Sequence, residues 1–207
     1  MSIIIKIMLS IAIQAGGESR RMGQEKALAP FLGQPLIVRV LQRVAPIADE
    51  VLITTNSPES FEFLNVQVFK DLVPGRGALG GLYTALSVAR HSLVAVVACD
   101  MPFVNPELLN AELQEMRNTG NDVVIPHASD GMQPFHAIYR RETCLPYVQS
   151  AVEAGYWRVD AWFPQVTVYH FPESEILKYD PSMRCFLNVN TLEELEDAER
   201  LASQLEM

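Results

Sequence analysis

The stretch "LVAVVACDMPF", residues 93–103, decides the fold, because a continuous apolar run is followed at once by an acidic residue. A strand with one solvated face alternates apolar and polar residues, whereas a strand buried on both faces is apolar throughout. Asp100 follows the run, and Pro102 then prevents the chain from continuing as a ladder strand or a helix. The stretch therefore predicts a central parallel strand that leads directly into a carboxylate.

Similar short runs alternate with helical patterns along the whole chain. The expected strands are Leu9–Gln14, Glu50–Thr55, Val66–Phe69, Leu93–Cys99, Asp122–Ile125, Phe135–Tyr139, Val166–His170 and Phe186–Val189. The expected helices are Pro35–Ala45, Ser57–Phe63, Leu79–Ala89, Pro106–Asn118, Glu142–Ala154 and Thr191–Leu205. This alternation predicts an α/β fold over residues 1–207 as a single domain, a doubly wound and mostly parallel sheet with helices on both faces. Such sheets bind ligands beyond the carboxyl ends of their strands.

Composition narrows the class of protein. Hydrophobic residues make up 49% of the 207 residues and charged residues 20%, which is typical of a globular domain. A net charge of −9 argues against a nucleic-acid partner, because such binding needs a basic face. The apolar N-terminal run is too short to span a bilayer and is better explained as a buried strand. We expect a cytoplasmic, monomeric protein with no membrane partner, whose three scattered cysteines are reduced.

The densest positive cluster lies in "QAGGESRRMGQEK", residues 14–26. Gly16 and Gly17 allow backbone N–H groups to approach a ligand closely, and successive N–H groups before a helix form an anion cradle. The stretch also supplies three cations, Arg20, Arg21 and Lys26. Its spacing matches neither the Walker A motif nor the dinucleotide fingerprint G-x-G-x-x-G. The pattern favours a polyphosphate ligand, and a simple turn with solvated arginines is the alternative.

Two aspartates follow expected strands. Asp100 is suited to magnesium, which binds through one or two carboxylates together with substrate phosphates. Asp71 precedes the glycine-rich segment 75–81 and is suited to accept hydrogen bonds from a base or sugar, or to join the metal. A turn or helix-cap role is the alternative for each aspartate.

These motifs together resemble the molybdenum cofactor guanylyltransferase family, a group of MobA-like nucleotidyltransferases. The family loop reads approximately L-A-G-G-x-S-x-R-M-G-x-x-K, and residues 14–26 reproduce it except that Gln14 stands where leucine is usual. The resemblance extends through "GALGG" (77–81), "CDMPF" (99–103), "QPFHAIYR" (133–140) and "FLNVNTLEEL" (186–195). It implies a Rossmann-like fold similar to nucleotide-diphospho-sugar transferases, and transfer of GMP from GTP to the terminal phosphate of molybdopterin with release of pyrophosphate.

The resemblance also implies roles for individual residues. The implied catalytic residues are Arg20, Arg21, Lys26 and Asp100, with Asp100 holding Mg²⁺. The implied nucleotide-binding residues are Gln14, Ala15, Gly16, Gly17, Lys26, Thr54, Asn56, Asp71, Gly77 and Asp100. The implied acceptor-binding residues are Arg158, Asn188 and Asn190, although "NTLEEL" also reads as a capping box formed by Thr191 and Glu194. GTP and the molybdenum cofactor are the implied substrates, and proteins of cofactor biosynthesis or molybdoenzymes the implied partners.

Three other functions compete with this interpretation. A molybdopterin cytidylyltransferase, or a relative with another phosphorylated acceptor, is the first, although Ala15-Gly16-Gly17 favours guanine over the Ala-Ala-Gly of those enzymes. A non-catalytic nucleotide-binding module is the second, and the presence of Lys26 and Asp100 argues against it. An NAD-dependent oxidoreductase is disfavoured because the G-x-G-x-x-G fingerprint is absent.

Overall fold

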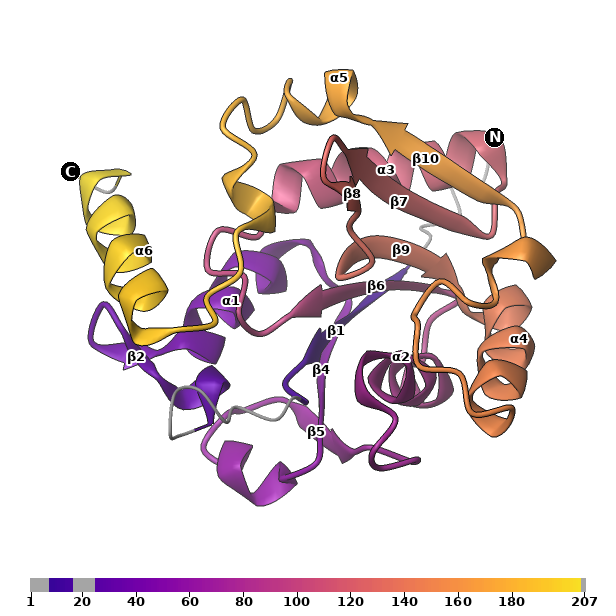
Figure 1. Ribbon diagram of the computed structural model, residues 1–207, viewed down its shortest axis with the longest axis horizontal. Helices are drawn as coiled ribbons and strands as arrows, with labels where there is room; N and C mark the ends of the chain where they lie inside the picture. Colours follow the sequence, from indigo (N-terminus) through magenta and orange to yellow (C-terminus); the bar gives the residue numbers. More distant parts are fainter. Residues whose placement is uncertain (1–7, 17–24, 206–207) are drawn as a thin grey trace, which may run out of the picture.

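The computed structural model describes residues 8–16 and 25–205 of the chain. Its main sheet has the strand order β10-β7-β9-β6-β1-β4-β5, with the short β8 (Gly131–Met132) paired to β7 (Figure 1). The strands are β1 (Leu9–Gln14), β4 (Glu50–Thr55), β5 (Gln67–Lys70), β6 (Leu93–Ala98), β7 (Val123–Ala128), β9 (His136–Arg140) and β10 (Val168–Pro172). β1, buried throughout, and β6, buried except at Ala98, lie side by side at the centre, as the apolar run of β6 predicts.

The sheet is mostly parallel. β1 pairs in parallel with β4 and β6, β4 with β5, and β7 with β10. β9 is antiparallel to both of its neighbours, β6 and β7, so all the long strands except β9 point the same way. The carboxyl ends of β5, β4, β1 and β6 consequently meet at one edge of the sheet.

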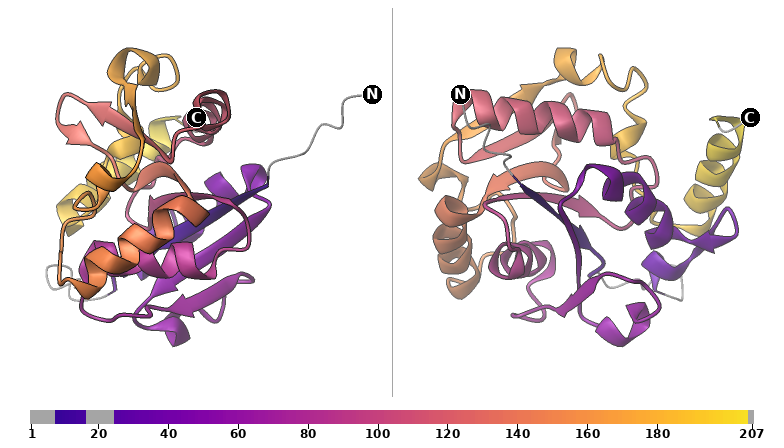
Figure 2. Two further views of the ribbon diagram at one scale, coloured as in Figure 1. Left: turned by 90° about the vertical axis from the view of Figure 1, so that its right-hand side faces the viewer. Right: turned by 180° about the vertical axis from the view of Figure 1, so that it is seen from behind.

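Helices cover both faces. The α-helices are α1 (Leu36–Val44), α2 (Gly77–Val88), α3 (Pro106–Thr119), α4 (Arg141–Glu153), α5 (Glu173–Ile176) and α6 (Leu192–Leu205). Alternate residues of β1 face opposite layers: Ile11 and Ile13 pack with α1 and α3, whereas Ala12 packs with α2 and α4. Figures 1 and 2 show α2 beside α4, and these two helices are in contact. The doubly wound α/β architecture predicted from the sequence is confirmed.

A third apolar cluster joins the C-terminal helix to the N-terminal half of the chain. The hairpin of β2 (Pro30–Phe31) and β3 (Gln34–Pro35) supplies Phe31, which is 1% exposed. Phe31 belongs to one cluster with Phe103, Val189 and Leu195 of α6. Figures 1 and 2 show α6 next to this hairpin at one end of the molecule. Packing of this cluster fixes the position of the chain just before α6.

Two expected elements are wrong. The strand expected at Phe186–Val189 is absent: the 3₁₀ turn η5 (Arg184–Phe186) precedes an irregular segment, whose Val189 N–H donates to the Asp100 carbonyl at 2.9 Å. That segment crosses the end of β6 instead of pairing along a strand. The helix expected at Ser57–Phe63 is the short 3₁₀ turn η3 (Pro58–Phe61), which buries Phe61. Apolar residues alone predicted both elements, but each segment contributes an anchor rather than a regular face.

A buried polar pair links α3 to β9. His136 and Glu112 are both 0% exposed, and Nδ1 of His136 lies 2.9 Å from Oε1 of Glu112. The Asn105 N–H donates to Nε2 of His136 at 3.4 Å, which leaves Nδ1 as the donor to the carboxyl group. Burial raises the pKa of Glu112 to about 7, and the nearby His136 opposes that rise. The His136 ring also packs edge-on against Phe186, 5.3 Å away between centroids, so the pair supports the segment before α6.

None of the helices within residues 8–16 and 25–205 has the length and hydrophobicity that a membrane span requires.

The buried carboxyl makes stability depend on pH in a defined direction. Between the ordinary pKa of 4.5 and the folded value of about 7, the folded state binds more protons at Glu112 than the unfolded state. Stability from this group therefore falls as pH rises. We expect the free energy of unfolding of the wild type, relative to Glu112→Gln, to fall by about 2–3 kcal/mol between about pH 5 and pH 8. Urea denaturation at both pH values measures this difference, and a constant difference would contradict the assignment.

Candidate active site

The residues at the carboxyl ends of the central strands line a pocket of about 200 Å³. The pocket contains six residues singled out from the sequence, Gln14, Ala15, Gly16, Lys26, Asp100 and Asn188. It also contains six that sequence reasoning did not single out, Glu25, Ala27, Ala78, Ala98, Cys99 and Phe135. The parallel register places Gln14 opposite both Thr54 and Ala98, which brings the ends of three strands to one place.

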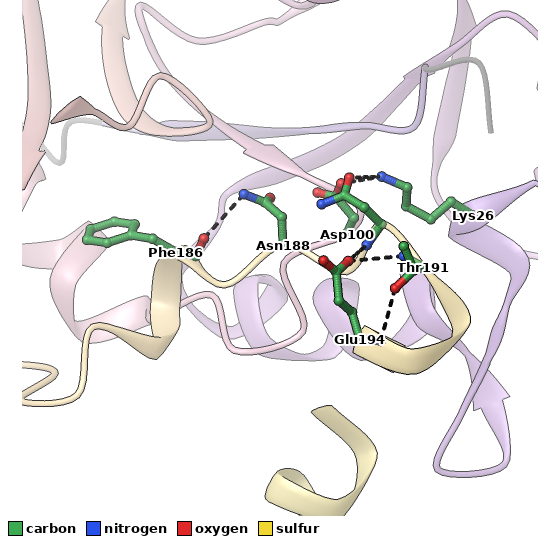
Figure 3. A network of polar contacts seen from close by, with 7 residues as sticks. Lys26, Asp100, Phe186, Asn188, Thr191 and Glu194 are labelled. Atoms are coloured by element: carbon green, nitrogen blue, oxygen red, sulfur yellow. Dashed lines mark hydrogen bonds and ion pairs between the residues drawn. The ribbon is translucent and has the colours of Figure 1, made fainter. Parts of the chain in front are cut away.

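Lys26 connects three distant parts of the chain. Its ammonium donates to Oδ2 of Asp100 at 2.7 Å and to Oδ1 of Asn190 at 2.8 Å. The Lys26 and Asp100 side chains are only 20% and 15% exposed, so their ion pair is partly shielded from solvent. Figure 3 shows Lys26 reaching towards Asp100 beside the start of α6. The acidic and basic residues predicted to share a site therefore do lie together.

A capping box positions Asn190. Thr191 Oγ1 accepts from the Glu194 N–H at 3.1 Å, while the Glu194 carboxylate accepts from the N–H groups of Thr191 and Asn190 (Figure 3). This reciprocal pattern caps α6 and is the one indicated by "NTLEEL". The alternative interpretation of this motif is thus confirmed for Thr191 and Glu194. The cap also holds the Asn190 backbone where its side chain can meet Lys26.

Asn188 lies on the same irregular segment and lines the pocket. Its Nδ2 donates to the carbonyl of Phe186 at 3.3 Å (Figure 3). Phe186 in turn packs against the ring of His136, so the buried His136–Glu112 pair supports the position of Asn188 at the pocket. Asn188 and Asn190 are both solvent-exposed, as an acceptor-binding role requires.

Asp71 approaches the glycine turn after β1. It is 8% exposed, and its N–H donates to the Thr55 carbonyl at 2.8 Å. A Cβ atom placed on Gly16 would lie 3.1 Å from Oδ2 of Asp71 and 3.8 Å from Nδ2 of Asn56, so glycine permits this close approach. Burial raises the pKa of Asp71, and a hydrogen bond from Thr84 partly offsets the rise.

Four buried polar atoms at these strand ends have no hydrogen-bond partner within the part of the chain that the structure describes. They are Gln14 Nε2, Thr54 Oγ1, Asp71 Oδ1 and Asp100 Oδ1. Buried polar groups are almost always paired in folded proteins, and each exception requires an explanation. Gln14 and Asp100 line the pocket, and Thr54 and Asp71 lie at the ends of the neighbouring strands, so these atoms together indicate a site that a polar ligand completes.

Comparison with known proteins identifies the family of the chain. The model of the MobA-like NTP transferase domain matches residues 11–166. The chain belongs to the MobA-like NTP transferase family. A protein of Natranaerobius thermophilus described as a probable molybdenum cofactor guanylyltransferase is 32% identical over 202 residues, covering 96% of this chain and 98% of the relative. A molybdenum cofactor guanylyltransferase of Desulfosudis oleivorans is 34% identical, covering 90% of this chain and 92% of the relative.

Solved structures confirm the fold of this MobA-like chain. Molybdopterin-guanine dinucleotide biosynthesis protein A of Archaeoglobus fulgidus has a TM-score of 0.83 at 28% identity, covering 94% of this chain and 99% of that one. A CMP:2-keto-3-deoxy-manno-octonic acid synthetase solved with CTP has a TM-score of 0.69 at 15% identity, covering 95% of this chain and 98% of that one, and shows the same fold. The chain thus has the Rossmann-like fold of nucleotide-diphospho-sugar transferases, as the sequence predicts.

The remaining residues singled out in this MobA-like chain lie at the margin of the pocket or outside the described residues. Gly77 begins α2, and the exposed Trp157 ring lies 4.0 Å from where its Cβ would be. Arg158 is 82% exposed and pairs with Asp160 at 2.6 Å, so it is not among the pocket residues. Gly17, Arg20 and Arg21 fall in the segment 17–24, which lies outside the described residues.

The pocket can accommodate a magnesium ion at one carboxylate. Asp100 offers Oδ1, which has no protein partner among the described residues, while Oδ2 is engaged by Lys26. No group of three or more His, Cys, Asp or Glu side chains within residues 8–16 and 25–205 is arranged to hold a metal by itself. A single carboxylate oxygen suits Mg²⁺, which takes its remaining ligands from water and phosphate oxygens.

The buried Asp71 predicts opposite effects on stability and binding. Replacing it by asparagine removes a carboxylate whose charged form burial disfavours, and we expect the unfolding free energy to rise by about 0.5–2 kcal/mol at neutral pH. The same change should weaken nucleotide binding, because the amide cannot replace a charged acceptor. Thermal unfolding and calorimetric titration with GTP measure the two effects. A variant that is less stable but binds GTP normally would contradict this role.

Proposed function

We propose that this protein transfers GMP from GTP to the terminal phosphate of molybdopterin in the molybdenum cofactor and releases pyrophosphate. The observation that carries the proposal is the partly buried Lys26–Asp100 pair at the pocket, with one Asp100 oxygen left without a protein partner among the described residues. The names of the relatives from Natranaerobius thermophilus and Desulfosudis oleivorans support the guanylyl donor and the acceptor.

The reaction needs charge neutralisation more than it needs a base. A phosphate oxygen of the acceptor is already nucleophilic at neutral pH. It forms a bond to the α-phosphorus of GTP as the bond to the bridging oxygen of pyrophosphate breaks. The main obstacle is repulsion between two anions, and fixed cations and backbone N–H groups reduce it most effectively when they are preorganised.

Lys26 is preorganised for this task. Its ammonium is held by Asp100 and Asn190, so it does not have to be ordered when the triphosphate binds. We propose that Lys26 contacts the phosphates, and that Arg20 and Arg21 add charge on the leaving pyrophosphate. We propose that Ala15, Gly16 and Gly17 bind the nucleotide through backbone groups, and that Thr54, Asn56 and Gly77 contact its edge.

Asp100 would hold Mg²⁺, which supplies charge neutralisation at the phosphates when bound. Two hydrogen bonds, one to its side chain and one to its main chain, fix the position of Asp100. Its Oδ2 accepts from Lys26, and its main-chain carbonyl accepts from Val189. These bonds therefore hold Lys26, Asp100 and the segment that carries Asn188 and Asn190 in fixed positions relative to one another.

We propose that the acceptor approaches from the side of the asparagines. Asn188 and Asn190 offer exposed amide groups beside Asp100, and Arg158 adds an exposed cation near Trp157 and the start of α2. An acceptor bound there would present its phosphate to the pocket that holds the donor. Positioning of the two substrates supplies much of the rate in such transfers.

Two substitutions test the catalytic assignments. Lys26→Ala and Asp100→Ala should each lower turnover by about a hundredfold or more, the usual effect of losing one electrostatic stabiliser. Lys178→Ala is the matched control, because it removes a surface lysine whose ion pair with Glu175 is exposed. Single-turnover formation of the nucleotide-linked pterin gives the rate, and near-normal rates in either site variant would exclude that residue.

A nucleotide panel tests the proposed substrate. Purified protein, Mg²⁺ and molybdenum cofactor are mixed with GTP, CTP, ATP or UTP in turn, and pyrophosphate and nucleotide-linked pterin are quantified. We expect both products from GTP and little from the other three. Preference for CTP would reassign the protein as a cytidylyltransferase, and binding without turnover would favour another acceptor or a non-catalytic role.

A further inference from the structure

The side chain of Gln14 is a buried hydrogen-bond donor that the protein itself does not use. Gln14 is the last residue of β1, is 7% exposed and lines the pocket. Its main-chain carbonyl accepts from the Cys99 N–H at 3.0 Å. Its Nε2 has no partner in the part of the chain that the structure describes. A buried amide N–H without an acceptor is costly, so a ligand acceptor would explain why the residue is tolerated.

Gly81 of α2 fixes where the amide lies. A Cβ atom placed on Gly81 would lie 2.8 Å from Cδ of Gln14 and 2.9 Å from its Nε2 and Oε1. The flat carboxamide therefore rests directly on the backbone of α2, in space that any other residue would occupy. This close packing holds the amide at the pocket instead of leaving it free to turn into solvent.

The register aligns Gln14 with other unpartnered groups. Ala12 of β1 and Leu52 of β4 both pack in the layer of α2, so two residues further along, Gln14 and Thr54 face that same layer. Gln14 and Thr54 are register partners on neighbouring strands, which lie about 4.8 Å apart. Phe69 of β5 is the register partner of Thr54, and Asp71, two residues further on and just after β5, faces the same layer. This face of the sheet edge thus offers a donor at Gln14 and, two residues further along the strands, an acceptor at Asp71.

We propose that Gln14 strengthens the preference for guanine by donating a hydrogen bond from Nε2 to the carbonyl oxygen at position 6 of the base, a contact that the usual leucine cannot make. Guanine presents this acceptor next to the N–H groups that a carboxylate such as Asp71 can accept, whereas adenine carries an amino donor at position 6. A donor beside an acceptor complements guanine and opposes adenine. This inference rests on the proposed function, since it assigns the base of that donor nucleotide.

The test uses a nucleotide altered at position 6 alone. In 6-thioguanosine triphosphate, sulfur replaces this oxygen and the ring N–H and amino groups remain, and sulfur is a weak acceptor. We expect the wild type to bind GTP about three- to tenfold more tightly than the thio analogue, the range for one hydrogen bond. In Gln14→Leu this preference should fall towards unity. Calorimetric titration without acceptor measures both dissociation constants.

A second variant moves the amide without removing it. Gly81→Ala should displace the Gln14 carboxamide, because the end of that side chain is the group nearest the new methyl, and should also abolish the preference. Gln149→Leu is the control, since Gln149 is exposed on α4 and its side chain donates to Glu153 in the next turn. Thermal unfolding confirms that each variant is folded before binding is compared.

Three outcomes would overturn the inference: no preference in the wild type, an unchanged preference in both variants, or an equal loss of affinity for both nucleotides. The last would place Gln14 against the ribose or phosphates. Because binding is measured without acceptor, failure of guanylyl transfer to molybdopterin would appear separately, as normal discrimination at position 6 without turnover.

Discussion

The contact of the Lys26 ammonium with Asp100 and Asn190 is the interaction on which the site depends. It joins the 3₁₀ turn η1 (Lys26–Leu28), the chain just after β6 and the segment before α6, which are far apart in the sequence. Each partner is fixed independently, Asp100 by its position after a buried strand and Asn190 by the capping box of α6. A partly buried ion pair has a desolvation cost, and the additional amide partner helps to offset it.

The sequence predicts most of the nucleotide side of the site, for a physical reason. Buried parallel strands have a strong local signature, and their carboxyl ends must meet at one edge, so Gln14, Lys26, Asp71 and Asp100 could be placed together before any coordinates. The sequence also predicts the strand at β9, but not its antiparallel pairing or the position of Phe135, just before it, at the pocket, because pairing between distant segments leaves no local pattern. The strand predicted at Phe186–Val189 is wrong for a similar reason. Its apolar residues pack against β9 and α6, and these distant contacts could not be read from the local sequence.

The polar atoms at the strand ends show how stability and function are balanced. A buried donor or carboxylate without a partner is uncommon in folded proteins. Gln14 and Asp100 present such atoms at the pocket, and Thr54 and Asp71 present them at the neighbouring strand ends. Hydrogen bonds to partners within the protein would make the fold more stable, but these atoms could then no longer bind a ligand. Although the chain carries a net charge of −9, the lysine at the pocket provides local positive charge where an anionic ligand would lie.

The hydrogen bond between Lys26 and Asn190 spans 164 positions in sequence. Contacts of such long range form late, because a long loop must be closed before they contribute, and the N-terminal part of a chain folds first during synthesis. A nascent chain that has left the ribosome only as far as α4 already holds the glycine turn and Asp100, but it lacks the asparagine half of the network. Assembly of the pocket thus coincides with docking of α6 onto the β2–β3 hairpin, so an incompletely folded chain does not sequester nucleotide in a finished site.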